Sequence, residues 1–320
     1  MVFRKIAIST FILFTLTATC WGRSAVVPQS MINGRSSFDF VRLMALNGAG
    51  ARGVEKGHEF VSSRFRCRVN RNARRCEING VKVDLNFPVT YVGGVPYVTG
   101  FDWHKTFRPL LYSATLKKHP LGTITIDMGH GGNDPGAIGV FSKEKNITLA
   151  AGRRLGKILQ SYGFRVFYTR NRDIKLPLES IDDIQRGHRS DLFISLHVNS
   201  AKDRSVYGIE TFCLTPLHAP SSGAKTVQRD NKRGNWFDEN NLALAYSVQK
   251  QMLRRTGAPD RGVKRANFVV LRNLNVPGIL VEIGFISHPI EERRLNNPVY
   301  IDVLARSIAD GIIQYKNSIK

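Results

Sequence analysis

The sequence is short of acidic residues, of cysteine and of long apolar segments. It has 25 Asp and Glu against 47 Lys and Arg in 320 residues, a formal net charge of +22. Such an excess of positive charge draws a protein toward polyanions. Nucleic acid is not the expected partner, because no helix-turn-helix, zinc-finger or aromatic RNA-binding signature is present and the basic residues are spread along the chain. An acidic cell envelope is the better candidate.

The chain has only four cysteines. Cys213 has no obvious partner, which argues against zinc binding through sulfur, and we expect a buried free thiol. A two-residue hairpin turn at Arg71-Asn72 would place Cys67 opposite Cys76, where antiparallel strands approach closely. Two interpretations are open: a disulfide, which an exported protein permits, or two separate thiols.

The apolar segment Ile6–Leu16 is too short to cross a bilayer comfortably, and no later stretch reaches that length, so no transmembrane span is expected. Arg4-Lys5 precede it and small residues follow it up to Cys20, a pattern typical of an export signal. We therefore expect residues 1–22 to be a signal peptide and the protein to lie in the periplasm or cell envelope. Cys20 leaves a lipoprotein anchor open, although Thr17 and Thr19 fit that signal poorly.

The rest of the chain has room for a small domain and a larger one. Residues 23–111 show a short helix and alternating strands with Asn and Gly turns, which predicts a small α+β domain. Residues 101–120 are aromatic, basic and irregular, and we place a linker at 112–121. In residues 122–320 strands and helices alternate, which predicts a layered α/β domain with a mostly parallel mixed sheet flanked by helices. Its expected strands are 123–128, 164–169, 192–197, 208–213, 267–271 and 279–283, its expected helices are 144–162, 241–256 and 300–315, and the segment after Thr169 is expected to be a polar connection.

Four side chains stand where such a sheet places its chemistry. His130 follows a β-branched strand and precedes Gly131-Gly132, and His197 ends a second apolar strand. Glu282 interrupts a third apolar strand, and Glu144 begins a helical pattern. The carboxyl ends of strands in open α/β sheets meet at ligand-binding crevices. Two His and one carboxylate form a common zinc set with an open position, and a second carboxylate can serve as the base in hydrolysis.

Each of these residues also has a structural interpretation. A histidine at a strand end is often a hydrogen-bonded, partly buried residue. A carboxylate at position 144 would also be favoured by the dipole of its own helix. Glu282 is harder to explain in this way, because an unpaired carboxylate within an apolar strand costs several kcal/mol.

Five motifs occur in order between residues 126 and 287. They are Ile126–Gly136, Lys143–Asn146, Thr169-Arg170, Ser195–Ser200 and Val281–Ser287. With these motifs the sequence resembles the zinc-dependent N-acetylmuramoyl-L-alanine amidases of the amidase-3 type, from Leu121 nearly to the C-terminus. Two positions depart from that family: Met128 replaces its usual proline, and Ile181 falls about where it has an arginine.

This resemblance implies one Zn²⁺ per chain with His130, Glu144 and His197 as ligands and Glu282 as the catalytic carboxylate. It also implies peptidoglycan as the substrate, with stem peptides cut from the glycan at the amide between N-acetylmuramic acid and L-alanine. Two alternatives stay open. One is a non-catalytic peptidoglycan-binding or scaffold protein with a degenerate amidase domain, and the other is a zinc carboxypeptidase that cuts between stem residues.

The segment from Leu214 to Asn240 has the composition of a loop. Some amidases of this type carry a helix here that plugs the zinc and is lifted by an activator, but this stretch lacks the apolar periodicity of such a helix. We expect either a substrate-side loop or a solvated surface loop. The candidate substrate contacts are Asn199, Asn235, Trp236 and Asn241.

The amino-terminal part carries a weaker resemblance. Ile78–Val83 and Gly93–Val98 are similar to the small module called copper-amine-oxidase N-terminal-like, which occurs on envelope proteins. This similarity implies no copper, because no ligand set is visible. It leaves room for an activator or envelope partner that binds through this module.

Overall fold

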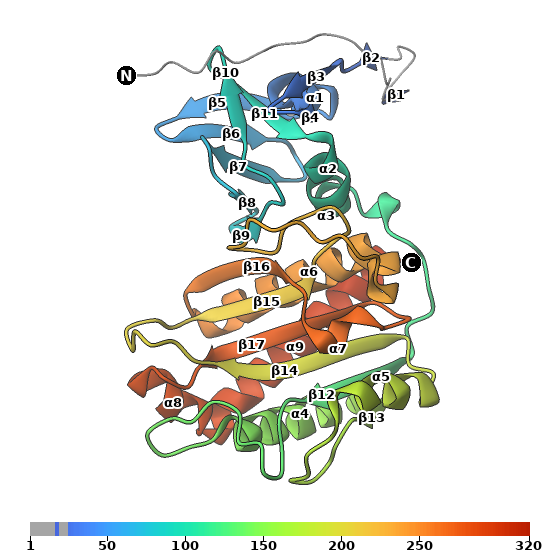
Figure 1. Ribbon diagram of the computed structural model, residues 1–320, viewed down its shortest axis with the longest axis vertical. Coiled ribbons are helices and arrows are strands. Elements are labelled where there is room, and N and C mark those ends of the chain that lie inside the picture. The colour runs from blue at the N-terminus through green and yellow to red at the C-terminus, as the bar shows by residue number, and fades with distance from the viewer. Residues whose placement is uncertain (1–16, 19–24) are drawn as a thin grey trace. The chain divides into compact units, whose positions relative to one another are not determined.

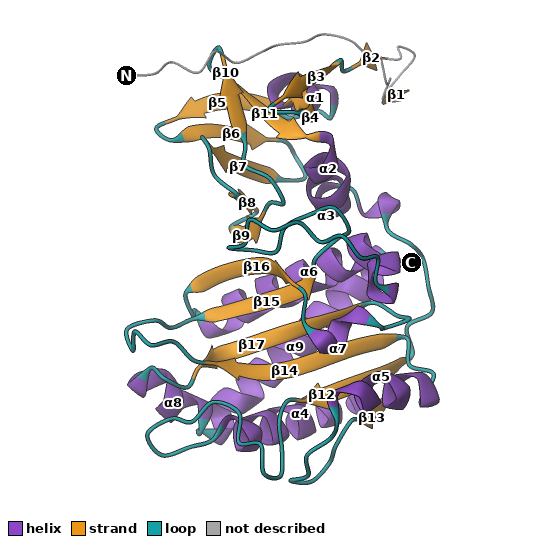
Figure 2. Ribbon diagram, viewed as in Figure 1, coloured by secondary structure: helices purple, strands orange, loops and turns teal. Residues whose placement is uncertain are grey.

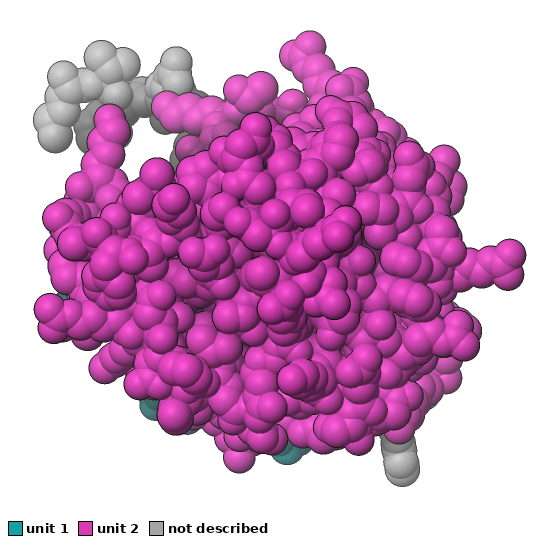
Figure 3. Space-filling model, turned by 90° about the horizontal axis from the view of Figure 1, so that it is seen from below, with its two compact units in different colours: residues 1–111 teal, residues 112–320 magenta. Residues whose placement is uncertain are grey.

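The computed structural model describes residues 17–18 and 25–320. The chain divides into two compact units, with the boundary in the sequence between Leu111 and Tyr112. Figure 3 colours the two units separately. The expected signal segment, including Cys20, lies outside the described residues except for β1 (Thr17–Ala18), which pairs with β2 (Ala25–Val26). Within the described part of the chain, no helix is both long and apolar enough to span a membrane.

The first unit is built from two antiparallel sheets and short helices (Figure 1). One sheet has the strand order β10-β11-β4-β3, and the other contains β9-β8-β7-β6-β5. The elements are β3 (Gln29–Ile32), β4 (Arg35–Asp39), α1 (Phe40–Leu46), β5 (Gly50–Val54), β6 (Gly57–Val61), β7 (Arg66–Asn70), β8 (Arg75–Ile78), β9 (Val81–Asp84), β10 (Thr90–Val92), β11 (Val95–Thr99), α2 (Gly100–Asp102), a π-helical turn (Trp103–Phe107) and α3 (Arg108–Leu111).

Aromatic packing and one buried carboxylate hold this unit together. The Phe40 ring lies 4.8 Å from that of Phe60 and 4.7 Å from that of Phe107. The Asp102 carboxylate accepts hydrogen bonds from the backbone N–H groups of Asn86 and Phe87. The expectation of irregular structure over residues 101–120 is wrong in its first half, because residues 100–111 are helical.

Cys67 and Cys76 are both free and buried, so of the two interpretations the separate thiols are correct. In the β7–β8 hairpin Cys67 lies opposite Ile78, and Cys76 lies opposite Val69. The two cysteines therefore miss each other by two positions in the register. Cys213 is also a buried free thiol, as predicted.

The second unit is a layered α/β domain with a mixed sheet in the order β13-β12-β14-β17-β15-β16 (Figure 2). The first four strands of that order are parallel to one another, and β15 and β16 run the other way. The strands are β12 (Thr123–Met128), β13 (Arg165–Tyr168), β14 (Leu192–Asn199), β15 (Ile209–Leu214), β16 (Asp260–Ala266) and β17 (Gly278–Phe285). This arrangement confirms the predicted fold class.

Helices cover both faces of this sheet (Figure 1). The long helices α4, α6 and α9 pack together on one face, and the shorter α5 and α7 contact each other on the other face, where Ile181 joins an apolar cluster with Phe193 and Leu280. The helices are α4 (Glu144–Ser161), α5 (Leu178–Gly187), α6 (Asp238–Thr256), α7 (Val269–Arg272), α8 (Pro289–Leu295) and α9 (Pro298–Ser318), with 3₁₀ turns at Ser113–Thr115 and Arg233–Phe237.

Two element predictions for this unit are wrong. The expected strand 267–271 contains the short helix α7, and the strand that pairs with β15 lies earlier, at β16. The expected polar connection after Thr169 contains helix α5. The other expected strands and helices occur, with ends that differ by a few residues.

Candidate active site

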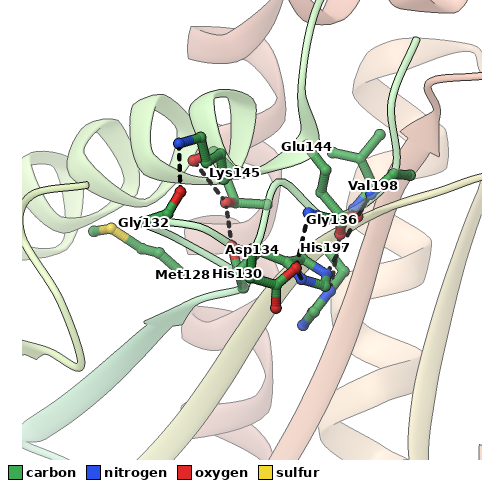
Figure 4. Close-up of polar contacts among 12 residues, drawn as sticks. Met128, His130, Gly132, Asp134, Gly136, Glu144, Lys145, His197 and Val198 are labelled. Carbon is green, nitrogen blue, oxygen red and sulfur yellow. Dashed lines mark hydrogen bonds and ion pairs between the residues drawn. The ribbon is translucent and has the colours of Figure 1, made fainter. Parts of the chain in front are cut away.

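His130, Glu144 and His197 come together at the carboxyl ends of β12 and β14 (Figure 4). One possible ligand atom from each of the three residues lies within 4.8 Å of the others. His130 Nε2 is 3.3 Å from Glu144 Oε2, and His197 Nδ1 is 2.9 Å from Glu144 Oε1. A carboxylate thus lies between two imidazoles that arrive from separate strands.

Backbone groups fix the Glu144 carboxylate in place. Its Oε2 accepts a hydrogen bond of 2.8 Å from Ala137 N, and its Oε1 accepts one of 2.9 Å from Val198 N. Burial raises the pKa of Glu144, but hydrogen bonds from His130 and His197 outweigh burial and hold this pKa well below its usual range. The hydrogen bond to Glu144 raises the pKa of His130 to about 9, with a smaller contribution from Asp134 and against the effect of burial. The site is therefore a fixed negative charge with two imidazoles directed at it.

Two glycines leave room for this cluster. A Cβ atom on Gly129 would lie 2.4 Å from the His197 ring, and a Cβ atom on Gly136 would lie 2.5 Å from Glu144 Oε2. His130 Nδ1 is 3.1 Å from Asp134 Oδ1, so Asp134 orients the ring and leaves Nε2 directed at Glu144. Two imidazoles and a carboxylate at these distances match the donor set of a divalent transition metal such as zinc. The residues present therefore fit such an ion.

Glu282 lies beside this cluster on the neighbouring strand. In the sheet register it is opposite His197 on one side and opposite Glu210 on the other. Its side chain is buried, and within the described residues its Oε2 atom has no hydrogen-bond partner. Burial raises the pKa of Glu282 to about 8, with a further contribution from Glu144 that His197 opposes. A buried carboxylate with a free oxygen is a group that can exchange a proton with a reactant.

Glu210 was not predicted as a site residue. It is buried, forms ion pairs with Lys264 and Arg261 and accepts a hydrogen bond of 2.6 Å from Asn199 Nδ2. The predicted contact Asn199 therefore lies close to Glu282 and is fixed by Glu210. No sequence signal marked this carboxylate, because its partners lie about fifty residues further along the chain.

The other three predicted substrate contacts do not join the cluster. Asn241 Oδ1 accepts a hydrogen bond from Gly278 N, at the amino-terminal end of β17 and four residues before Glu282. Asn235 Nδ2 donates to Thr215 O and Asp238 Oδ1. Asn235 and Asn241 are both buried, and their side chains form hydrogen bonds with other groups of the protein. Trp236 is 56% exposed on the 3₁₀ turn.

Arg170 supports the segment that carries His130. It is buried, and its guanidinium donates to the backbone oxygens of Met128, Gly129 and Lys145. Beside it, a cavity of about 410 Å³ lies against His130 and His197. The far wall of this cavity is largely apolar and is formed by Leu176, Pro177, Leu178, Ile181 and Val270. Ile181, where a departure from the family pattern was expected, thus belongs to the apolar wall.

Comparisons with known proteins identify the family of this chain. Residues 124–314 match the family described as N-acetylmuramoyl-L-alanine amidase. The chain is 32% identical to the N-acetylmuramoyl-L-alanine amidase AmiA of Escherichia coli strain K12, over 60% of this chain and 75% of that protein. It is also similar to the crystal structure of an N-acetylmuramoyl-L-alanine amidase from Clostridium difficile 630, with a TM-score of 0.53 and 29% identity over 62% of this chain and 98% of that one.

A third similarity involves a complex. The CwlD amidase from Clostridioides difficile, solved with the GerS lipoprotein, has a TM-score of 0.53 and 27% identity over 61% of this chain and 98% of that one. The family match extends over more than half of this chain, and it contains every member of the His130, Glu144 and His197 cluster together with Glu282. The chain belongs to the N-acetylmuramoyl-L-alanine amidase family.

Proposed function

We propose that this protein hydrolyses the amide bond between N-acetylmuramic acid and L-alanine in peptidoglycan, with one zinc ion held by His130, Glu144 and His197. The observation that carries the proposal is the convergence of these three side chains from two strands and a helix start, within 4.8 Å. Family membership supports the reaction and the substrate. Zinc is the ion named because two His and one carboxylate are a common zinc donor set.

A bound zinc ion supplies Lewis-acid chemistry, which polarises a carbonyl group and makes a water molecule more acidic. The protein's own residues hold and orient the reacting groups. Asp134 fixes the ring of His130, and the N–H groups of Ala137 and Val198 hold the Glu144 carboxylate. These contacts preset the donor atoms before a substrate arrives, so little reorganisation is needed.

We assign the proton transfers to Glu282. Its carboxylate accepts a proton from the attacking water and later delivers it to the nitrogen of L-alanine. The bond between the lactyl carbonyl carbon of N-acetylmuramic acid and that nitrogen breaks, so one water and one amide give a carboxylic acid and an amine. The support for this role is the buried position of Glu282 next to His197 and its hydrogen-bond-free Oε2 among the described residues.

We also propose a layout and a location for the chain. Residues 122–320 would form the catalytic domain, preceded by a small envelope module at 23–111 and a linker at 112–121. Export to the periplasm or cell envelope is supported by the sequence pattern of residues 1–22. The module at 23–111 is our candidate surface for an activator or envelope partner, and a related amidase has been solved in complex with a lipoprotein.

The decisive experiment is digestion of purified peptidoglycan followed by mass spectrometry. The wild-type protein is expected to release stem peptides that carry a free L-alanine amine, and a chelator should stop the release. Glu282→Gln should keep its zinc by elemental analysis and lose at least about a hundredfold in turnover, because an amide cannot act as a base. Shortened stems would indicate a carboxypeptidase, and binding without any product would indicate a scaffold protein. Near-normal turnover by Glu282→Gln would refute the role of this residue.

A further inference from the structure

A second hollow lies near the metal-ligand cluster and shares no lining residue with the apolar cavity. It has a volume of about 310 Å³ and is lined by residues 138–140, by Ala201, Lys202 and Arg204, and by residues 286–287. Ile138 is the chain neighbour of Ala137, whose N–H donates to Glu144. The hollow therefore begins next to a residue that is hydrogen-bonded to a proposed metal ligand.

Two cations on this hollow have no carboxylate partner within the described part of the chain. Lys202 and Arg204 are both exposed, and Arg204 Nε donates only to the backbone oxygen of Ser287, at 3.3 Å. The acidic residue between them, Asp203, is occupied elsewhere, because its Oδ1 accepts hydrogen bonds from Ser205 N and Ser205 Oγ. The positive charge of both side chains is thus available to a ligand.

The opposite wall of the hollow is a loop with a fixed shape. The buried carboxylate of Glu292 accepts hydrogen bonds of 2.9, 2.9 and 3.0 Å from the N–H groups of Val140, Phe141 and Ser142, and one of 2.8 Å from Ser142 Oγ. This clamp presents apolar side chains to solvent, with Ile138 at 64% and Val140 at 70% exposure. An ordered apolar edge beside two unpaired cations is typical of a preformed binding site rather than of a solvated loop.

We propose that this hollow binds the acidic stem peptide of the substrate, with Lys202 and Arg204 recognising the α-carboxylate of the residue that follows L-alanine. This inference rests on the proposed function. The positive charge of the hollow favours an anion, and a glutamate linked through its γ-carboxyl group at the second stem position would offer an α-carboxylate one residue from the scissile amide.

The test compares two ligands that differ in one group. N-acetylmuramoyl-L-alanyl-D-glutamate has the α-carboxylate, and N-acetylmuramoyl-L-alanyl-D-isoglutamine has a neutral amide in its place. Their Kd values are measured by calorimetry with zinc-loaded Glu282→Gln protein, in which turnover is blocked. The carboxylate ligand should bind about three to ten times more tightly than the amide, the range expected for contacts with exposed cations.

The variant Lys202→Gln/Arg204→Gln, made in the same background, should bind the two ligands equally. The matched control Lys157→Gln/Arg254→Gln removes two exposed cations from helices α4 and α6 and should keep the preference. Equal binding by the parent protein, no detectable binding of either ligand, or a preference that survives in Lys202→Gln/Arg204→Gln would each overturn the proposal. If Glu282→Gln does not fold, metal-stripped wild-type protein replaces it.

Failure of the two proposals can be told apart. The peptidoglycan digest reports whether the wild-type protein cleaves the amide, and calorimetry reports carboxylate recognition without any turnover. A preference for the carboxylate ligand in a protein that does not cleave peptidoglycan would support the subsite and refute the proposed hydrolysis. Cleavage without that preference would refute only the subsite.

Discussion

At the scale of single residues, the candidate site depends on a missing side chain. The backbone of Gly129 lies so close to His197 that a Cβ atom would sit 2.4 Å from Cε1 of the ring and 2.5 Å from Nε2. We predict that Gly129→Ala displaces the His197 ring and lowers zinc affinity by roughly ten- to a hundredfold, as changes around metal ligands commonly do. Zinc affinity is measured by competition with a chromogenic chelator.

The control for this variant is Gly187→Ala, at the end of α5, where an added Cβ atom meets nothing within 4 Å. It should bind zinc like the wild-type protein. An unchanged zinc affinity in Gly129→Ala would mean that the imidazole has room to move without leaving the metal, and the close packing would then have no role in the site.

The environment of Glu59 leads to a prediction about how the stability of the protein depends on pH. It is almost fully buried on the first unit, where it forms ion pairs with Arg52, Arg66 and Arg68. The hydrogen bond from Arg52 contributes most to lowering the pKa of Glu59 below its usual value of 4.5. A carboxylate with a lowered folded-state pKa stabilises the protein above the unfolded-state pKa, and this stabilisation is lost as the pH falls through the folded-state value.

We therefore predict that Glu59→Gln lowers the thermal unfolding midpoint of the protein at pH 7. As the pH falls from 4.5 through the lowered folded-state pKa, the difference from wild type should shrink progressively, because the unfolded state takes up the proton first and folded Glu59 is protonated last. The exposed Glu55 lies at the turn of the same hairpin, so Glu55→Gln serves as the charge-matched control and should unfold like wild type at both pH values. A Glu59→Gln difference that stays constant between pH 7 and pH 3 would contradict this explanation.

The residues of the candidate site could be located from the sequence because each marks an abrupt change of pattern. His130 and His197 end apolar strands, and Glu282 interrupts one. The carboxylates that support the site could not be predicted in this way. Glu210 and Glu292 bind groups that are distant in the chain, and Glu292 binds mainly backbone N–H groups, which carry no side-chain signature.

At the scale of elements, helix α8 holds three segments around the site with two consecutive residues. Glu291 accepts hydrogen bonds from Gly208 N and Phe285 N, and Glu292 accepts those of residues 140–142. Several charge-assisted hydrogen bonds to one carboxylate make each contact stronger than a neutral one. Helix α8 thus holds in place the loop that forms one wall of the proposed peptide subsite.

We predict that Glu292→Gln loosens this loop. Hydrogen exchange at the amides of residues 140–142 should rise several-fold, and the free energy of unfolding should fall by roughly 1–3 kcal/mol, since hydrogen bonds to a charged group are replaced by weaker ones. Turnover on peptidoglycan should also fall. Ile290→Ala, at an exposed neighbouring position, is the control and should change neither exchange nor turnover. Unchanged exchange at residues 140–142 would show that the carboxylate does not order the loop.

The element predictions failed where tertiary contacts override local pattern. Residues 267–271 are apolar and β-branched enough to resemble a strand, but α7 forms there because Val270 and Leu271 pack into the apolar cluster over β14 and β17. The true strand β16 is rich in charge, and Lys264 on it is accommodated by the ion pair with Glu210. A short apolar run cannot by itself distinguish a strand from a helix.

The hairpin between β7 and β8 is a second case in which the local sequence does not determine the structure. A two-residue turn would have aligned Cys67 with Cys76, but the observed connection is longer. Within it, Arg71 N donates to Lys56 O and Asn72 N donates to Val89 O. These hydrogen bonds lead to other segments of the first unit, so the register depends on partners that the hairpin sequence does not contain.

At the scale of the whole molecule, the chain joins a catalytic fold to a separate unit with its own core. The family match begins at residue 124, within the second unit, and the first unit lies outside that match. The proposed metal site, Glu282 and the proposed peptide subsite all belong to the second unit. A ligand of this site should therefore stabilise the second unit directly.

This linkage gives a prediction for metal removal. A ligand that binds only the folded state at a hundred times its Kd adds about 2.7 kcal/mol to the free energy of unfolding. For a unit of about two hundred residues this corresponds to a rise in Tm of roughly 5–10 °C. Zinc added to chelator-treated protein should produce this rise in calorimetry, and magnesium at the same concentration should not, because it prefers oxygen ligands.

Two variants decide whether the rise comes from the proposed ligands. His197→Ala should show almost no shift with zinc, because it removes one of the three donor groups. Glu282→Gln should show the full shift, because this residue is assigned to proton transfer and not to the metal. An equal shift in His197→Ala would place the zinc somewhere other than the cluster of His130, Glu144 and His197. If zinc did not raise the Tm of Glu282→Gln, Glu282 would be a metal ligand. Another group would then have to transfer the proton from the attacking water.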